Sequence, residues 1–395
     1  MPPAKSRTIG LVVLLAATAT AAIARADDER WDGLGRELAE YRAQLDAVRR
    51  ENGGVRKLPP VAFFLFGMGD RRKLVYKGGV LRDARTGEEV RRWDVQDERI
   101  APSAYAVALK TMGGGRVFLV EDEEAVWLEE DGRKTALARG RVVLPTFAGR
   151  RRAAVLRVLR QELLINVVEG RPTPNFMVYP KPWYRDGAMM AMAFEKTGDL
   201  DLIRGWILGL REPYDRNNNG EDEADNLGEA LYLISLVSDA DHPLVPVVRR
   251  ELKRFEKGRH IEGRSDFAPH PVYQTLWAKL GLASLGLDDP YEAPRTADGY
   301  AALAWWAPRT DDRLAQKVIE SDAYPYLTWA GSHFTGSHRG KLGDRDYPLT
   351  WEADASQADY RGMNVVDPAY AEAKLCTPHT WHAAEALLDL LDREP

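Results

Sequence analysis

Hydrophobic and polar positions divide the chain into three stretches of different periodicity. Between residues 29 and 51 the apolar side chains recur every three or four positions, as in a single helix that ends before Asn52. From 59 to 147 short apolar runs alternate with glycine-rich turns, a pattern typical of antiparallel hairpins. From about residue 150 to the end the spacing is helical almost throughout.

The runs and the links between them predict the architecture. Strands are expected at 61–66, 73–76, 105–110, 117–120, 125–128 and 142–144. Helices are expected at 150–168, 185–197, 200–210, 226–238, 243–257, 271–285, 299–306, 325–336 and 378–391, with a short one at 369–375. Gly198 should end one helix and Asp199 should cap the next. Because short links alternate with long ones, we predict a mainly α fold, an α/α toroid of antiparallel helical hairpins preceded by a small antiparallel β-domain.

The N-terminal residues are typical of an export signal. Lys5 and Arg7 precede an apolar run at 9–23, and a small-x-small cleavage pattern ends at Ala26. The run is shorter than the roughly 20 residues that a membrane span needs. We therefore expect an exported protein, periplasmic or extracellular, with a signal peptide at 1–26 that is cleaved after Ala26. An N-terminal helix at 27–58, the β-domain at 59–147 and the toroid at 148–395 would follow.

Composition narrows the choice of partners. The chain carries 55 basic and 60 acidic residues, and removing Lys5, Arg7 and Arg25 with the signal leaves 52 against 60, or −8. This balance argues against nucleic acid or an anionic membrane as a partner, apart from the export signal itself. Cys376 is the only cysteine, so no intrachain disulfide can form, and the fold depends on its hydrophobic core.

Aromatic residues stand beside charged ones at the start of the helix expected at 185–197. Trp183 offers a flat face for a sugar ring, and Arg185 is a planar donor fork suited to a polar ligand. Asp186 falls in the first helical turn, where the helix dipole favours a carboxylate. We predict that all three contact a carbohydrate substrate.

The segment from Asp215 to Asn226 is rich in carboxylates and amides. Its first half has the D-x-N-x-N-G pattern of a calcium loop, with Asn217 and Asn219 as further oxygen donors. The twelfth position, however, is Asn226 and not the bidentate Glu that calcium loops use. We therefore favour a substrate-facing loop without a cofactor, and calcium is the weaker interpretation.

Two acidic loops far apart in sequence could supply the paired carboxylates that glycoside hydrolysis needs. The first contributes Glu223 or Asp225, and the residues leave the choice between them open. The second places Glu352 beside Trp351, with Asp359 a few residues further on. We predict Glu352 and one residue of the first loop as catalytic groups. Further cleft contacts are expected from Asn226, His270, Gln274, Trp351, Asp359, His379 and Trp381.

The step Trp183-Tyr184-Arg185-Asp186, followed by a helical hairpin and later by Trp351-Glu352, resembles the six-hairpin glycosidase superfamily, which includes glucoamylase-like and trehalase-like enzymes. The resemblance covers roughly residues 150–395. It implies an (α/α)₆ toroid, often behind a β-domain, with an Arg-Asp pair at the sugar and distant acidic residues as catalysts. It implies that Arg185 and Asp186 contact sugar and that Glu352 is a catalytic carboxylate. About ten helices are expected after residue 150, where a full ring needs twelve.

The resulting hypothesis is an exported glycoside hydrolase that acts on an oligo- or polysaccharide, with inversion favoured. A polysaccharide lyase on the same scaffold is the alternative enzyme class, with a base and a carboxylate-neutralising group drawn from Asn226, His270, His333, Tyr360 and Arg361. A glycan-binding protein without activity is the third interpretation.

Overall fold

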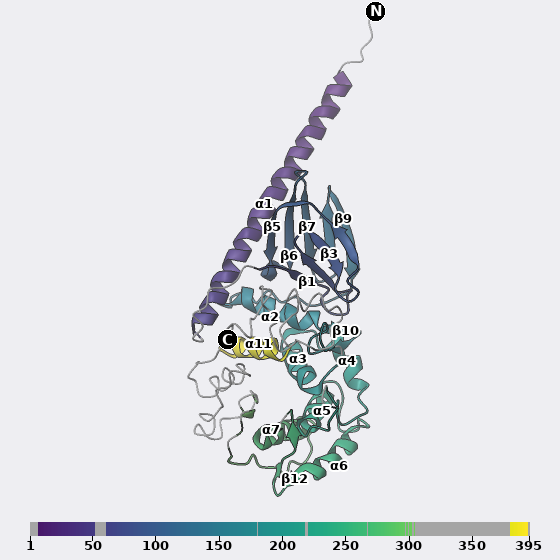
Figure 1. The fold of residues 1–395 in the computed structure, drawn as a ribbon, viewed down its shortest axis with the longest axis vertical. Helices are drawn as coiled ribbons and strands as arrows, with labels where there is room; N and C mark the ends of the chain where they lie inside the picture. Colours follow the sequence, from purple (N-terminus) through teal and green to yellow (C-terminus); the bar gives the residue numbers. More distant parts are fainter. Residues whose placement is uncertain are drawn as a thin grey trace, which may run out of the picture.

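The computed structural model describes residues 7–51, 61–179, 181–217, 220–266, 268–296, 298, 300–301, 304 and 380–393. A long helix, α1 (Arg7–Glu51), runs along one side of two antiparallel sheets, and the other helices lie beyond one end of these sheets (Figure 1). Within the described residues no helix has both the length and the apolar character needed to cross a membrane.

The two sheets are simple meanders. The first has the order β1-β2-β3-β4, with strands at Phe64–Phe66, Leu74–Lys77, Val80–Asp83 and Glu89–Arg92. The second has the order β5-β6-β7-β8-β9, with strands at Val95–Ala101, Ala106–Thr111, Arg116–Glu121, Ala125–Glu130 and Arg133–Arg139. A 3₁₀ turn, η1 (Pro102–Ala104), joins β5 to β6.

Alternation along the strands gives the five-stranded sheet two apolar faces. Val107 and Leu119 belong to the main core, which continues into the helices. Ala108 and Phe118, from the opposite side of the same strands, form a small cluster with Trp31 of α1. Because successive side chains of a strand point to opposite faces, α1 covers one face of this sheet while the main core covers the other.

Seven further helices follow the sheets in the described part of the chain. They are α2 (Ala153–Ile165), α3 (Tyr184–Thr197), α4 (Asp201–Leu208), α5 (Asp225–Ser235), α6 (Val245–Phe255), α7 (Pro271–Ser284) and α11 (Thr380–Arg393). Three two-stranded hairpins lie in their links: β10 (Val167–Val168) with β11 (Arg171–Pro172), β12 (Glu256–Lys257) with β13 (His260–Ile261), and β14 (Arg264–Ser265) with β15 (Ala268–Pro269).

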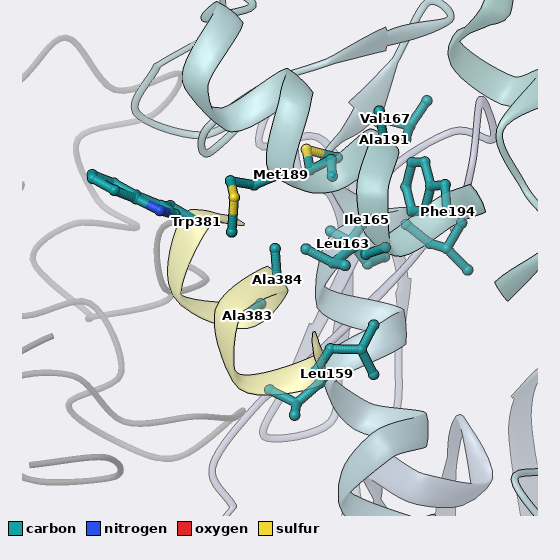
Figure 2. Packing of buried hydrophobic residues seen from close by; sticks show 14 of the residues in the cluster. Leu159, Leu163, Ile165, Val167, Met189, Ala191, Phe194, Trp381, Ala383 and Ala384 are labelled. Atoms are coloured by element: carbon teal, nitrogen blue, oxygen red, sulfur yellow. The ribbon is translucent and has the colours of Figure 1, made fainter. Parts of the chain in front are cut away.

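The C-terminal helix completes the helical core. In Figure 2, Trp381 and Ala384 of α11 face Met189 of α3 and Leu163 of α2. All four side chains are buried in one cluster with the sheet residues. Packing then continues from α3 to α5 and from α5 to α7, so these helices form a row that leads away from the sheets (Figure 1).

The prediction of a mainly α toroid is wrong. The described residues contain eight α-helices together with a four-stranded and a five-stranded antiparallel sheet, and the helices do not form a ring of hairpins. The resemblance to the six-hairpin glycosidases is wrong for the same reason. Helix periodicity located α2 to α7, but it carried no information about how the helices pack against each other and against the sheets.

Two local predictions also need correction. The run at 142–144 is not a strand: the backbone N–H of Val143 donates to Asp199 Oδ1 at 2.9 Å. Asp199 therefore does not cap α4, and its other carboxyl oxygen pairs with Arg160 of α2. Gly198 does end α3, in the left-handed conformation at φ 98°.

Candidate functional site

Arg185, in the first turn of α3, lies among three carboxylates. Its Nε and Nη2 donate to Asp225 Oδ2 at 3.1 and 2.9 Å, and Nη2 also donates to Glu223 Oε2 at 3.2 Å. Its Nη1 donates to Asp266 Oδ2 at 2.6 Å. These carboxylates come from the first residue of α5, the loop before it, and the turn between β14 and β15. Arg185 thus joins segments that are distant in sequence.

Uncharged donors also hold two of these carboxylates, those of Glu223 and Asp225. The backbone N–H of Asp266 donates to Glu223 Oε1 at 2.7 Å, and Ser265 Oγ donates to Asp225 Oδ1 at 2.5 Å. Gln274 Nε2 of α7 in turn donates to Ser265 Oγ at 2.8 Å. The hairpin β14-β15 is thereby held to both α5 and α7.

The polar network extends along α5. Asn226 Nδ2 donates to Glu229 Oε2 at 3.1 Å, and Asn226 Oδ1 accepts from the backbone N–H of Asp215. Tyr273 of α7 donates its hydroxyl to Glu229 Oε1 at 3.4 Å. Glu229 is fully buried and links α5 to α7 through Tyr273, while Asn226 is 1 % exposed and joins α5 to the loop at Asp215.

The pKa values of the carboxyl groups around Arg185 are displaced in different directions. Burial, and after it the charge of Asp225, raises the pKa of Glu223 to about 7. Burial likewise raises the pKa of Asp215 to about 7 and that of Glu229 well above its ordinary value. For Asp266 burial acts in the same direction, but Arg185 and the Tyr300 hydroxyl outweigh it and lower the pKa below the ordinary value.

Aromatic rings lie on one side of Arg185. Its guanidinium carbon is 5.1 Å from the ring centre of Trp381 and 5.7 Å from that of Tyr300. Tyr300 also stacks on His270, with ring centres 3.7 Å apart and planes 6° from parallel. The side chains of Asp266 and His270 are 22 % and 15 % exposed, so the cluster opens to solvent on their side.

The structure brings together many of the predicted site residues. Arg185 contacts Glu223, Asp225 and Trp381. Asn226 accepts from the backbone N–H of Asp215, and Gln274 donates to Ser265.

Asp186 takes a different position from its neighbour Arg185. Its Oδ1 accepts from Thr380 Oγ1 at 3.0 Å, and the residue is 1 % exposed, so it joins α3 to α11. Trp183 is half-buried, with its ring centre 4.7 Å from that of Tyr179. The prediction that Asp186 contacts sugar therefore has no support in this geometry.

Several predicted residues lie outside the described part of the chain: Asn219, Trp351, Glu352, Asp359 and His379. The predictions for these positions stay predictions.

The calcium interpretation can be examined at two of its three positions. Both carboxyl oxygens of Asp215 accept backbone hydrogen bonds, from the N–H groups of Tyr184 and Asn217. Asn217 directs its side-chain Nδ2 to Glu223 Oε2 at 2.9 Å. Within the described residues no group of three or more His, Cys, Asp or Glu side chains is arranged to hold a metal ion. The contacts of these two residues are those of a hydrogen-bonded turn.

Sequence reasoning missed several members of the cluster, chiefly Ser265, Asp266, Asp298 and Tyr300. Asp266 has φ +53° in the turn between β14 and β15, and its carboxylate accepts from Arg185. A short Arg-Ser-Asp segment carries no periodic signal, so no pattern at this position indicated a site. Comparison with protein-family models, with curated proteins and with solved structures gave no match.

Proposed function

We propose that this chain is a glycoside hydrolase that acts on an oligo- or polysaccharide, with Glu223 as proton donor and Asp266 as its ionised partner. The observation that carries the proposal is that both carboxyls contact Arg185 although their pKa values are displaced in opposite directions. A carboxyl pair of this kind supplies one acid and one base at neutral pH.

The chemistry requires one proton in and one proton out. Glu223 would protonate the glycosidic oxygen as its bond to the anomeric carbon breaks. Asp266 would accept a proton from the water that attacks this carbon, or would attack it directly if configuration is retained. Asp266 suits the second role because its side chain is 22 % exposed, whereas that of Glu223 is 1 % exposed.

The surroundings of the pair favour a sugar over other substrates. Trp381 and Tyr300 are buried, at 6 % and 5 % exposure, and lie beside Arg185, so they form the apolar back of the site. Carboxylates, His270 and a tyrosine hydroxyl offer hydrogen bonds to sugar hydroxyls.

A broad glycan panel, followed by both reducing-end release and absorbance near 235 nm, tests the proposal. We expect reducing ends without absorbance from the wild type, and at least about a hundredfold loss in Glu223→Gln, the range typical of lost acid catalysis. An unsaturated product that absorbs would assign the chain to the polysaccharide lyases instead. Saturable binding with no product from any glycan would leave a glycan-binding protein.

A further inference from the structure

Asp298 is a buried carboxylate that no predicted motif contained, and it accepts four hydrogen bonds. Its Oδ2 accepts from the backbone N–H groups of Val272 and Tyr273, at 2.8 and 3.0 Å, in the first turn of α7. Its Oδ1 accepts from the N–H of Tyr300 at 2.8 Å and lies 2.9 Å from His270 Nδ1. The Asp298 side chain is fully buried, so solvent cannot replace these partners.

These four contacts determine where the Tyr300 ring lies. His270 precedes α7, and the same carboxylate holds its imidazole and the backbone of Tyr300. The two rings are stacked at 3.7 Å with planes 6° from parallel. The Tyr300 hydroxyl then reaches Asp266 Oδ2 at 2.6 Å, on the same oxygen that accepts from Arg185.

We propose that Asp298 is a positioning residue for the acid–base pair: it holds the His270–Tyr300 stack so that the tyrosine hydroxyl donates to Asp266 and keeps its carboxylate turned toward Arg185. The proposal rests on the proposed function only where it concerns turnover. Its geometric part, the link from Asp298 through Tyr300 to Asp266, holds for any activity of the site.

Several charged or titratable groups act on Asp266, and each enters the test. Arg185, Glu223 and Tyr300 are hydrogen-bonded to its side chain or backbone, and His270 is close enough to act on it electrostatically. Burial opposes the ionised carboxylate, so the loss of the Tyr300 donor should raise the pKa of Asp266 toward that of an ordinary aspartate.

The experiment is a pH titration of the Asp266 carboxyl ¹³C signal in the full chain, labelled at aspartate and assigned with Asp266→Asn. Tyr300→Phe keeps the ring stack and removes only the hydroxyl, so the pKa of Asp266 should rise. Asp298→Asn should raise it by a similar amount, because an amide offers one acceptor oxygen where the carboxylate offers two. In the double variant the two effects should not add, since both act through one hydrogen bond.

The matched control is Asp199→Asn, which alters another buried carboxylate that holds a backbone N–H and an arginine. It should lower the melting temperature without moving the pKa of Asp266. If Asp298→Asn lowers the melting temperature equally and leaves that pKa unchanged, Asp298 is only a structural cap and the proposal fails. The proposal also fails if Tyr300→Phe, which should fold because it leaves the core intact, has no effect on that pKa.

Turnover separates this proposal from the proposed function. If the chain hydrolyses a glycan, the acidic limb of the kcat/KM profile should lie at a higher pH in Tyr300→Phe than in the wild type. If no glycan is cleaved while the carboxyl titration behaves as expected, the hydrolase proposal falls and the positioning role of Asp298 stands.

Discussion

Arg185 donates to both Glu223 and Asp266, but the two carboxyl groups differ in their other neighbours and in their burial. Arg185 approaches Asp266 at 2.6 Å and Glu223 at 3.2 Å, and Tyr300 adds a donor to Asp266 alone. Glu223 is the more buried of the two and also faces the charge of Asp225. Closer opposite charge favours ionisation, and desolvation beside a like charge disfavours it, so one guanidinium supports two protonation states.

This difference predicts the pH dependence of activity. The pKa of Glu223 is raised to about 7, so the acid form is present below that pH and is lost above it. We expect the profile of kcat/KM on a cleaved glycan to have a basic limb above about pH 7, where it falls about tenfold per pH unit. Glu223→Gln should remove about a hundredfold or more of the rate, together with that limb.

Glu221→Gln is the matched control for this prediction. It removes a carboxylate from the same loop, but one that is exposed and pairs with Arg264 outside the cluster. Its pH profile should match that of the wild type. A wild-type profile that is flat from pH 6 to 9 would contradict the role given to Glu223.

At the residue scale, three residues that the sequence singled out lie together in the structure. Arg185, Glu223 and Asp225 were predicted because charged residues beside a helix start or within an acidic loop are informative by themselves. Asp266 and Asp298 were not predicted, because their partners are distant in sequence. Asp266 lies in a hairpin turn and pairs with Arg185, 81 residues away, and Asp298 bonds to the N-terminus of α7 at Val272, 26 residues away. Asp186 lies apart from Arg185 because neighbours on a helix point about 100° apart, so the two side chains reach different partners.

At the element scale, α5 and α7 form the closest helix pair near the site. A Cβ on Gly228 would lie 2.3 Å from the backbone carbon of Trp277, and one on Gly281 would lie 2.6 Å from the carbonyl oxygen of Gly228. The two backbones are thus in direct contact through glycine. This contact sets the spacing between Glu229 of α5 and Tyr273 of α7, which are hydrogen-bonded across the interface.

The pair gives a stability prediction with an internal control. Gly228→Ala should lower the free energy of unfolding by about 2–4 kcal/mol, because overpacking against rigid backbone forces the helices apart. Gly205→Ala in α4 should instead stabilise the chain by about 0.5–1 kcal/mol, since nothing lies within 4 Å of the added methyl group and alanine favours helix. Urea unfolding measures both. Equal effects of the two substitutions would refute the close contact.

Helices were easier to predict than strands for a physical reason. α3 and α7 begin and end within a residue of their predicted bounds, because apolar positions repeat and Gly198 marks an end. The strands β4 and β9 are mostly exposed and carry charged residues, so they lack an apolar run that marks a strand. Because these strands give no apolar run, the sequence underestimates the sheets relative to the helices, and the prediction was a mainly α fold.

At the scale of the whole molecule, α1 is attached to the five-stranded sheet by apolar and charged contacts. Trp31 is 2 % exposed, and Arg99 lies 4.5 Å from its ring centre. Arg30 pairs with Glu129 of β8, and Asp28 pairs with Arg116 of β7. All these residues lie after Ala26, so cleavage at the predicted signal-peptide site would leave the contacts in place.

The export proposal therefore predicts a mature chain that begins at Asp27 and keeps α1 on the sheet. N-terminal sequencing of protein recovered outside the cytoplasm should read Asp-Asp-Glu. The mature protein should also have the same melting temperature as a form that starts at Met1. Recovery of exported protein that still begins at Met1 would contradict cleavage.

Lys73 lies where the four-stranded sheet meets the helices, and it is buried among backbone carbonyls. Its Nζ donates to the carbonyl oxygens of Gly67 and Gly69, both at 2.5 Å. The neighbouring Glu121 accepts from the N–H of Gly67 and from Arg71. Burial lowers the pKa of Lys73 to about 7, and the nearby Glu121 offsets only part of this effect.

The lowered pKa predicts that stability rises with pH above neutrality. Between about pH 7 and 10 the unfolded chain keeps a proton on Lys73 that the folded chain has released, so the free energy of unfolding increases with pH, by up to about 1.4 kcal/mol per unit. Urea unfolding at pH 7.5, 8.5 and 9.5 measures this slope. Lys73→Met should abolish it, whereas Lys77→Met, at the exposed end of the strand β2 that follows Lys73, should keep it. If the wild type shows no slope, or if Lys73→Met keeps it, Lys73 stays protonated in the fold and its ammonium group holds the Gly67–Gly69 turn as a charged donor.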